Sequence, residues 1–277
     1  MVMRWAVVLV LLLGTAGCDS TTSSFAPQSA RTVAHSTSRS ATRPSLRLPH
    51  RTLRVVGLGD SVMVGTNCEC PGIVPEYAAA LATRTRQHVT STNLALNGKV
   101  TSEVLDDLRG DATTQRTVSR ADLVLVTIGA NDLLPQLEEW QASTCDAACY
   151  TGPVQQMGAE LGRVLDAVES LRGGRRDGVL VTDYWNVFTD GDVAVRSGGA
   201  EQVDWSEDVT AAANRAICQA AKSHGAVCVD LVSPFKGAFR GPQQTDPTDL
   251  LAPDGDHPNA AGVADIVRSL INATDTR

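Results

Sequence analysis

Residues 53–61 read LRVVGLGDS, a mostly apolar run that ends on a Gly-Asp-Ser corner. Gly, Asp and Ser are all turn formers, so one interpretation is a plain turn. The other is a bend that presents the Ser61 hydroxyl to a substrate. A dinucleotide-binding loop is excluded, because a GxGxxG pattern that starts at Gly57 needs glycine where Val62 stands.

Four further apolar runs downstream resemble this one and predict buried strands. The five runs are Leu53–Leu58, Val89–Leu94, Leu123–Ile128, Val179–Thr182 and Ala226–Leu231. Helical patterns lie between or after them, over 101–108, 153–172, 205–221 and 260–270. Strand–helix alternation predicts one α/β domain with a parallel sheet and helices on both faces.

The polar segments that follow these strands are the candidate functional loops, because chemistry in parallel sheets gathers outside the carboxyl ends of the strands. They are Gly59-Asp60-Ser61, Asn93–Gly98, Gly129–Asp132 and the loop that begins at Asp183.

Side chains in these loops suit acyl transfer, which needs a nucleophile, a base, a group that orients the base, and donors for an oxyanion. Ser61 offers a hydroxyl and its own amide. Gly98 offers an unshielded amide, and Asn131 offers an uncharged side-chain donor. Far downstream, His257 is the candidate base, and Asp254 lies three residues before it.

Four blocks in this order resemble the SGNH, or GDSL, hydrolase superfamily: GDS (59–61), NLALNG (93–98), GAND (129–132) and DGDH (254–257). The resemblance implies a flavodoxin-like three-layer α/β/α sandwich with a five-stranded parallel sheet. It implies ester hydrolysis through an acyl-enzyme, with Ser61 as nucleophile, His257 as base and Asp254 as its partner. Ser61, Gly98 and Asn131 would form the oxyanion hole, and no metal or cofactor would be needed.

The stretches VTDYWNVFTDGDVA (181–194) and DGDHPNAAG (254–262) resemble secreted or envelope-attached bacterial members of that superfamily. Their substrates would be small-molecule, lipid or glycan esters. A carbohydrate O-deacetylase or acyltransferase on the same machinery is the alternative function. A binding protein without turnover is disfavoured, because every catalytic position is filled.

The first 17 residues have the pattern of a signal peptide, with Arg4 before the apolar run Ala6–Leu13. Cys18 follows small residues as in a lipobox, which predicts a lipid anchor and an envelope lipoprotein; ordinary secretion is the alternative. Residues 18–50 predict a disordered linker, because 13 of the 32 residues from 19 to 50 are Ser or Thr.

The remainder, 51–277, predicts one hydrolase domain of a size that buries a sizeable core. Five of the chain's 24 basic residues and one of its 31 acidic residues precede it, which leaves a formal charge of −11. This charge argues against a nucleic-acid partner. We expect a monomer.

Six cysteines follow Cys18, and an exported protein is expected to oxidise them. Cys218 and Cys228 have a spacing suited to one bridge. Cys68, Cys70, Cys145 and Cys149 leave three pairings open, including links between the two loops. A zinc site is disfavoured, because CxC and CxxxC match structural zinc spacing poorly.

Aromatic residues gather after the fourth strand in a chain that has few of them. Tyr184 and Trp185 are candidates for a substrate pocket, and packing as core beneath the loop is an equal alternative.

Overall fold

A computed structural model describes residues 48–145, 148–237 and 246–274. The predicted signal peptide, Cys18 and the linker as far as residue 47 lie outside the described residues. Within the three described ranges, every helix is too short or too polar to span a lipid bilayer.

Five parallel strands form one sheet in the order β2-β1-β3-β4-β5. The strands are β1 (Leu53–Gly59), β2 (Val89–Asn93), β3 (Leu123–Thr127), β4 (Val179–Thr182) and β5 (Val227–Val229). β3 is central and buried along its whole length, as expected for a strand covered on both faces. The predicted five-stranded parallel sheet is therefore confirmed, with each strand within three residues of its expected bounds.

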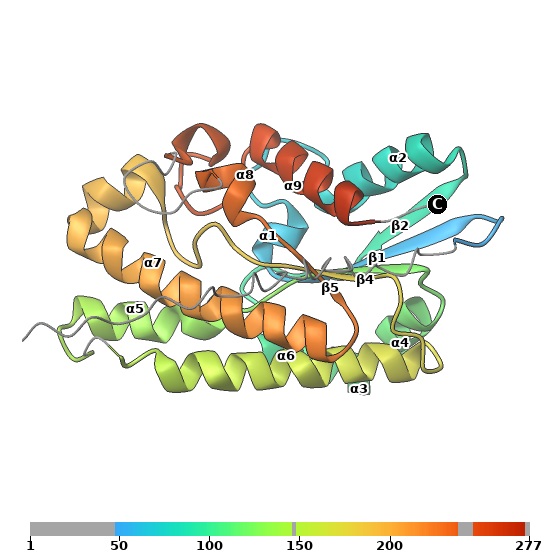
Figure 1. Cartoon of the computed structure of the whole chain (residues 1–277), viewed down its shortest axis with the longest axis horizontal. Helices are drawn as coiled ribbons and strands as arrows, with labels where there is room; N and C mark the ends of the chain where they lie inside the picture. The colour runs from blue at the N-terminus through green and yellow to red at the C-terminus, as the bar shows by residue number, and fades with distance from the viewer. Residues whose placement is uncertain (1–47, 146–147, 238–245, 275–277) are drawn as a thin grey trace, which may run out of the picture. The chain divides into compact units, whose positions relative to one another are not determined.

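Helices cover both faces of this sheet, which confirms the three-layer α/β/α sandwich (Figure 1). In Figure 1, α2 (Ile73–Thr85) and α9 (Ala260–Ala273) lie above the sheet and contact each other. Below it lie α3 (Thr101–Gly110), α4 (Ala112–Ser119), α6 (Thr151–Leu171) and the later part of α7 (Gly191–Ser223). The shorter helices are α1 (Ser61–Val64), α5 (Leu134–Gln141), α8 (Val232–Lys236) and the 3-10 turns η1 (Asn131–Leu133) and η2 (Thr248–Leu250).

The longest predicted helix shows why these segments fold as they do. In α6 the apolar residues recur every three or four positions and are buried: Val154, Met157, Leu161, Val164, Leu165 and Val168. They pack against α3 and α7. α7 starts earlier than its apolar pattern predicts, and Gly199 interrupts its helical backbone at φ 74°.

Three disulfides resolve the pairing that the spacing left open. Cys218–Cys228 ties α7 to β5, as predicted. Cys68 pairs with Cys70, and Cys145 pairs with Cys149, so each of these bridges lies within one loop. Links between the two loops, which the sequence leaves open, are not formed.

Candidate active site

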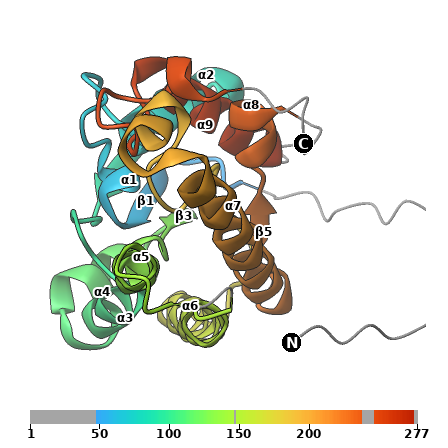
Figure 2. The ribbon, with the colours of Figure 1, turned by 90° about the vertical axis from the view of Figure 1, so that its left-hand side faces the viewer.

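The carboxyl ends of the strands meet at the end of the sheet where α1 lies, which faces the viewer in Figure 2. The corner after β1 depends on Gly59. Its φ is +144°, and a Cβ there would lie 1.9 Å from the Thr127 carbonyl oxygen on β3. The next amide, of Asp60, donates to that same oxygen at 3.2 Å. The chain therefore turns directly beside the neighbouring strand.

Ser61 is the first residue of α1 and is partly exposed. Asp60 caps this helix, because its Oδ1 accepts a hydrogen bond from the Val62 amide at 3.0 Å. The amide of a first helical residue has no acceptor within the helix, so among the described residues the Ser61 N–H remains available to bind an anion or an oxyanion.

Asp60 is buried beneath this corner. Its Oδ2 accepts a hydrogen bond from the Tyr184 hydroxyl at 2.8 Å. Burial raises the pKa of Asp60 from 3.8 to about 7, against the opposing effect of the hydrogen bonds from Tyr184 and Val62. The carboxyl next to Ser61 therefore carries a proton through mildly acidic pH.

His257 lies in the loop before α9 and is held by Asp254. The distance from His257 Nδ1 to Asp254 Oδ2 is 2.8 Å, whereas Asp256 Oδ2 lies 3.8 Å from the same nitrogen. Among the described residues, His257 Nε2 has no hydrogen-bond partner although it is buried. A hydrogen bond at Nδ1 sets the tautomer, so Nε2 is the nitrogen left to accept a proton.

Asp254 is fixed from several sides. Its Oδ1 accepts hydrogen bonds from the amides of Asp256 and His257, both at 3.0 Å. Its Oδ2 also accepts from Asn67 Nδ2 at 2.5 Å. Partial burial acts to raise the pKa of Asp254, but these hydrogen bonds outweigh it and lower the pKa to about 2. Asn67 was not predicted, since nothing in its local sequence links it to a loop 187 positions away.

The histidine loop also depends on the segment after β4. Gly255 has a φ of +69°, and its carbonyl accepts a hydrogen bond from the Asp190 amide at 2.7 Å. The Asp190 side chain forms a buried ion pair with Lys236 of α8, with 2.7 Å from Nζ to Oδ2. This pair anchors the segment that holds the backbone between Asp254 and His257.

Asn131 begins η1, after β3, and donates from Nδ2 to the Lys99 carbonyl at 2.9 Å. The next residue, Asp132, accepts from the Thr101 amide and hydroxyl, each at 3.0 Å. Burial raises the pKa of Asp132 to about 6, against these hydrogen bonds. Both side chains tie the loop after β3 to the loop after β2.

Gly98 lies in the loop after β2 at φ +77°, and a Cβ there would meet nothing within 4 Å. The preceding residue, Asn97, accepts a hydrogen bond from the Thr66 hydroxyl at 2.8 Å, so this loop contacts the chain that follows α1. Asn93 makes a second link to that region, because its Nδ2 donates to the Met63 carbonyl at 2.9 Å.

A small cavity of about 80 Å³ opens beside Ser61. Ser61, Asn131 and Asp256 line it together, while Gly98 and His257 are outside its lining. The remaining lining residues come from the corner, the loop after β3, α5 and the segment after β4: Asp60, Val62, Ala130, Leu134, Leu137, Tyr184, Trp185, Asn186, Val187, Phe188 and Thr189.

Tyr184 and Trp185 both line this cavity and are both almost fully buried. Trp185 stacks on Phe235 with 4.2 Å between ring centroids. Packing as core and bordering the cavity, which the sequence offered as alternatives, thus coexist in these two residues.

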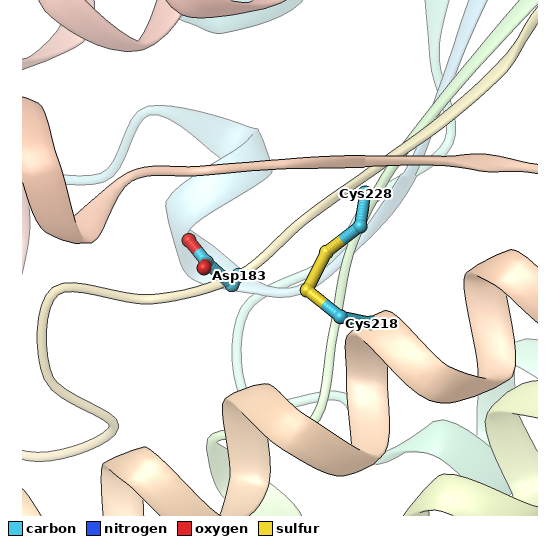
Figure 3. Close-up of side chains that lie close together, drawn as sticks. All are labelled: Asp183, Cys218 and Cys228. Carbon is cyan, nitrogen blue, oxygen red and sulfur yellow. A yellow bond between two sulfur atoms is a disulfide. The ribbon is translucent and has the colours of Figure 1, made fainter. Parts of the chain in front are cut away.

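Away from this cavity, the side chains of Asp183, Cys218 and Cys228 lie within metal-ligand spacing of one another (Figure 3). The two sulfurs are bonded to each other, so neither is a thiolate. Asp183 Oδ1 accepts a hydrogen bond from the Leu231 amide at 2.6 Å. This cluster is therefore a structural junction between β4, α7 and β5.

Comparison with known proteins identifies the family. A sequence profile of the GDSL-like lipase/acylhydrolase family matches residues 58–264, well over half of the chain. The chain belongs to this family. As a GDSL hydrolase it acts on ester bonds, and the superfamily expected from the four sequence blocks is confirmed. A search of curated proteins found no match to this GDSL hydrolase.

Solved structures share the fold of this GDSL hydrolase at low sequence identity. A lipase from a goat rumen metagenome is 23% identical, with a TM-score of 0.66 over 82% of this chain and 99% of its own. An extracellular lipase from Streptomyces rimosus is 22% identical, with a TM-score of 0.57 over 80% and 100%. An acetyl xylan esterase from Geobacillus stearothermophilus is 16% identical, with a TM-score of 0.55 over 82% and 97%.

Proposed function

We propose that this protein is a serine esterase in which Ser61 is the nucleophile, His257 the general base and Asp254 the carboxylate that orients it. One observation carries the proposal: the Asp254 carboxylate holds His257 Nδ1 at 2.8 Å, which leaves Nε2 unpaired among the described residues. The Asn67–Asp254 hydrogen bond brings this loop against the chain that follows Ser61 and α1.

In the proposed reaction, His257 Nε2 takes the Ser61 proton as the hydroxyl oxygen attacks the ester carbonyl. The tetrahedral intermediate collapses, the C–O bond to the alcohol breaks, and the alcohol leaves with the proton from His257. Water then attacks the acyl-enzyme by the same proton transfers and releases the acid. Asp254 stays ionised throughout, in accord with its low pKa.

The oxyanion would be held by three donors: the amides of Ser61 and Gly98, and Asn131 Nδ2. The helix start leaves the Ser61 amide free. Asn131 donates one of its two Nδ2 protons to the Lys99 carbonyl, and the second proton remains available to the substrate. Each such donor is worth about 3 kcal/mol of transition-state stabilisation in measured cases.

The cavity beside Ser61 favours a short acyl group. Its volume of about 80 Å³ is far below the roughly 300 Å³ at which sites for drug-sized ligands begin. Apolar side chains such as Leu134, Leu137 and Val187 suit a methyl or propyl group there. We therefore propose acetyl to butyryl esters as the preferred substrates, rather than long-chain lipids.

The same observation supports a second candidate, a carbohydrate O-deacetylase or acyltransferase. A cavity that binds the acetyl group does not restrict the alcohol part of the ester. A sugar could therefore be the leaving alcohol, or it could replace water as the acyl acceptor. Acetate release from acetylated glycans separates these activities from simple ester hydrolysis.

Initial rates on p-nitrophenyl acetate, butyrate and palmitate test the proposal. We expect acetate and butyrate to be cleaved fastest, and Ser61→Ala to abolish turnover. Ser170→Ala, an exposed serine on α6, is the matched control and should keep full activity. A fluorophosphonate probe should add its mass to the peptide that contains Ser61. Full activity of Ser61→Ala would overturn the proposed nucleophile, and palmitate as the best substrate would overturn the short acyl preference.

We further propose that the protein is exported and held at the membrane by a lipid on Cys18, with residues 18–50 as the tether to the domain. The lipobox-like sequence before Cys18 and the Ser/Thr-rich composition of the tether support this placement. Release into the medium after ordinary signal cleavage is the alternative.

A further inference from the structure

A second cavity lies at the other end of β1, away from the candidate active site. It measures about 320 Å³, several times the volume beside Ser61, and falls in the range of small-molecule sites. Arg54, the second residue of β1, lines it, whereas Ser61 lies two positions after Gly59, the last residue of that strand. Arg54 and Gly59 are five positions apart, so at about 3.3 Å per residue these two points of the strand lie about 17 Å apart.

Three arginines and four threonines make up most of the lining of this cavity, called the basic groove below. On the sheet, Arg54 and Val56 stand opposite Thr90 and Thr92 of β2, so the four share one face. On the helical side, Thr113, Arg116, Thr117 and Arg120 follow the spacing i, i+3, i+4 and i+7, which puts them on one face of α4 and its C-cap. Strands β1 and β2 on one side and α4 on the other thus direct arginine and threonine side chains toward one space.

The three guanidinium groups are not neutralised. Among the described residues, none of them forms an ion pair with a carboxylate; Arg116 donates one hydrogen bond, to the Thr113 hydroxyl at 3.1 Å. The buried acid Asp122 accepts from the Arg54 backbone amide and is already held by Arg51 at 2.7 Å. Asp111, the N-cap of α4, interacts with Arg116 through its charge only. An acidic domain thus keeps three unpaired positive charges around one cavity.

We propose that this basic groove binds a small phosphorylated ligand through its phosphate monoester group. A guanidinium group can bind a phosphate through two parallel hydrogen bonds. A phosphate monoester carries nearly two negative charges, so its charge balances three arginines better than the single charge of a carboxylate does. Threonine hydroxyls add hydrogen bonds to a polar, hydroxyl-bearing body. None of the described residues that line the groove is aromatic, so they offer a nucleobase no ring to stack on.

Calorimetric titration of the full chain carrying Cys18→Ser, which removes the anchor, tests the proposal with glucose 6-phosphate, inorganic phosphate and uncharged glucose. We expect glucose 6-phosphate to bind, glucose not to bind, and affinity to fall as potassium chloride rises from 50 to 200 mM. Arg54→Gln and Arg120→Gln should each weaken binding by about tenfold or more. Arg54→Lys should lose part of that affinity, because it keeps the charge but not the paired hydrogen bonds.

Arg215→Gln, an exposed arginine on α7, is the matched charge control and should bind as the unchanged chain does. Hydrolysis of p-nitrophenyl acetate should be the same in all four variants, which separates this site from the proposed esterase site. If Arg215→Gln weakened the binding of glucose 6-phosphate as much as the groove variants do, the loss would come from net charge alone, and the proposal would be overturned. Retention on phosphatidylglycerol vesicles without any binding of glucose 6-phosphate would also overturn it, since a membrane surface would then be the partner.

Discussion

At the scale of single residues, the structure distinguishes between two carboxylates, Asp254 and Asp256, as the hydrogen-bond partner of His257 Nδ1. Asp254 and Asp256 flank Gly255, yet only Asp254 reaches hydrogen-bond distance of Nδ1. The left-handed backbone at Gly255 turns the two side chains differently, so the residue three positions back faces the ring.

Exchanging each acid for its amide separates their roles. We expect Asp254→Asn to lower kcat on p-nitrophenyl acetate by up to about 10⁴-fold, because an amide favours the wrong imidazole tautomer. Asp256→Asn should cost less than about fivefold, as for a solvent-screened charge pair. Steady-state kinetics at pH 8 measure both, and a larger loss in Asp256→Asn would reassign the orienting carboxylate.

Asp60 makes a second residue-level prediction, on the pH dependence of stability. Its pKa is about 7 in the folded protein and near 3.8 when unfolded, so the folded state binds more protons between these values. The free energy of unfolding should therefore fall by about 1 kcal/mol per pH unit from pH 4 to 7 through this group, and no further above pH 7.

Denaturant unfolding of Asp60→Asn measures this contribution. The variant cannot ionise at that position, so its stability relative to the unchanged protein should rise steadily from pH 4 to 7. Asp106→Asn, on the exposed face of α3, is the control and should leave the difference flat. Parallel profiles for Asp60→Asn and the unchanged protein would mean that Asp60 ionises normally.

At the scale of elements, the three disulfides differ in what they constrain. Cys218–Cys228 closes a separation of 10 residues between α7 and β5, whereas Cys68–Cys70 closes a separation of 2 within one loop. A cross-link stabilises mainly by restricting the unfolded chain, and the restriction grows with the length of the closed segment.

Paired serine variants test this difference. Replacing Cys218 and Cys228 together should lower the free energy of unfolding by about 2–3 kcal/mol, and replacing Cys68 and Cys70 by about 1 kcal/mol. Equilibrium denaturation under non-reducing conditions gives both values. The reverse order would show that the Cys68–Cys70 bridge contributes by shaping the loop that carries Asn67.

Several helices were missed or misplaced from sequence for local reasons. α2 has Pro75 in its first turn and starts after Gly72, signals that also mark loops. The first part of α7 contains Gly198 and Gly199, and the low helix propensity of glycine argues against a helix there. The helix forms nonetheless, and it buries Ala194 and Gln202. In α6, by contrast, the apolar stripe is regular enough to predict the helix.

At the scale of the whole molecule, location is the main prediction. Mass spectrometry of a membrane fraction should find the mature chain starting at Cys18 with a lipid on its sulfur. Cys18→Ser should move the esterase activity from the membrane to the soluble fraction. An unmodified chain with a different N-terminus, free in the medium, would contradict the anchor and support secretion.

The sequence by itself determined the five-stranded parallel sheet and the family, because strand runs and the four blocks are local patterns that read directly from neighbouring residues. It also placed Asp254 beside His257, which are only three positions apart. Tertiary structure alone decided what joins distant segments: the Asn67–Asp254 contact, the Tyr184–Asp60 hydrogen bond, the Asp190–Lys236 pair that supports the histidine loop, and the groove between β2 and α4. Such contacts depend on how whole elements pack against one another. Packing brings together side chains that are far apart in the sequence, and the residues next to each of them do not indicate the contact.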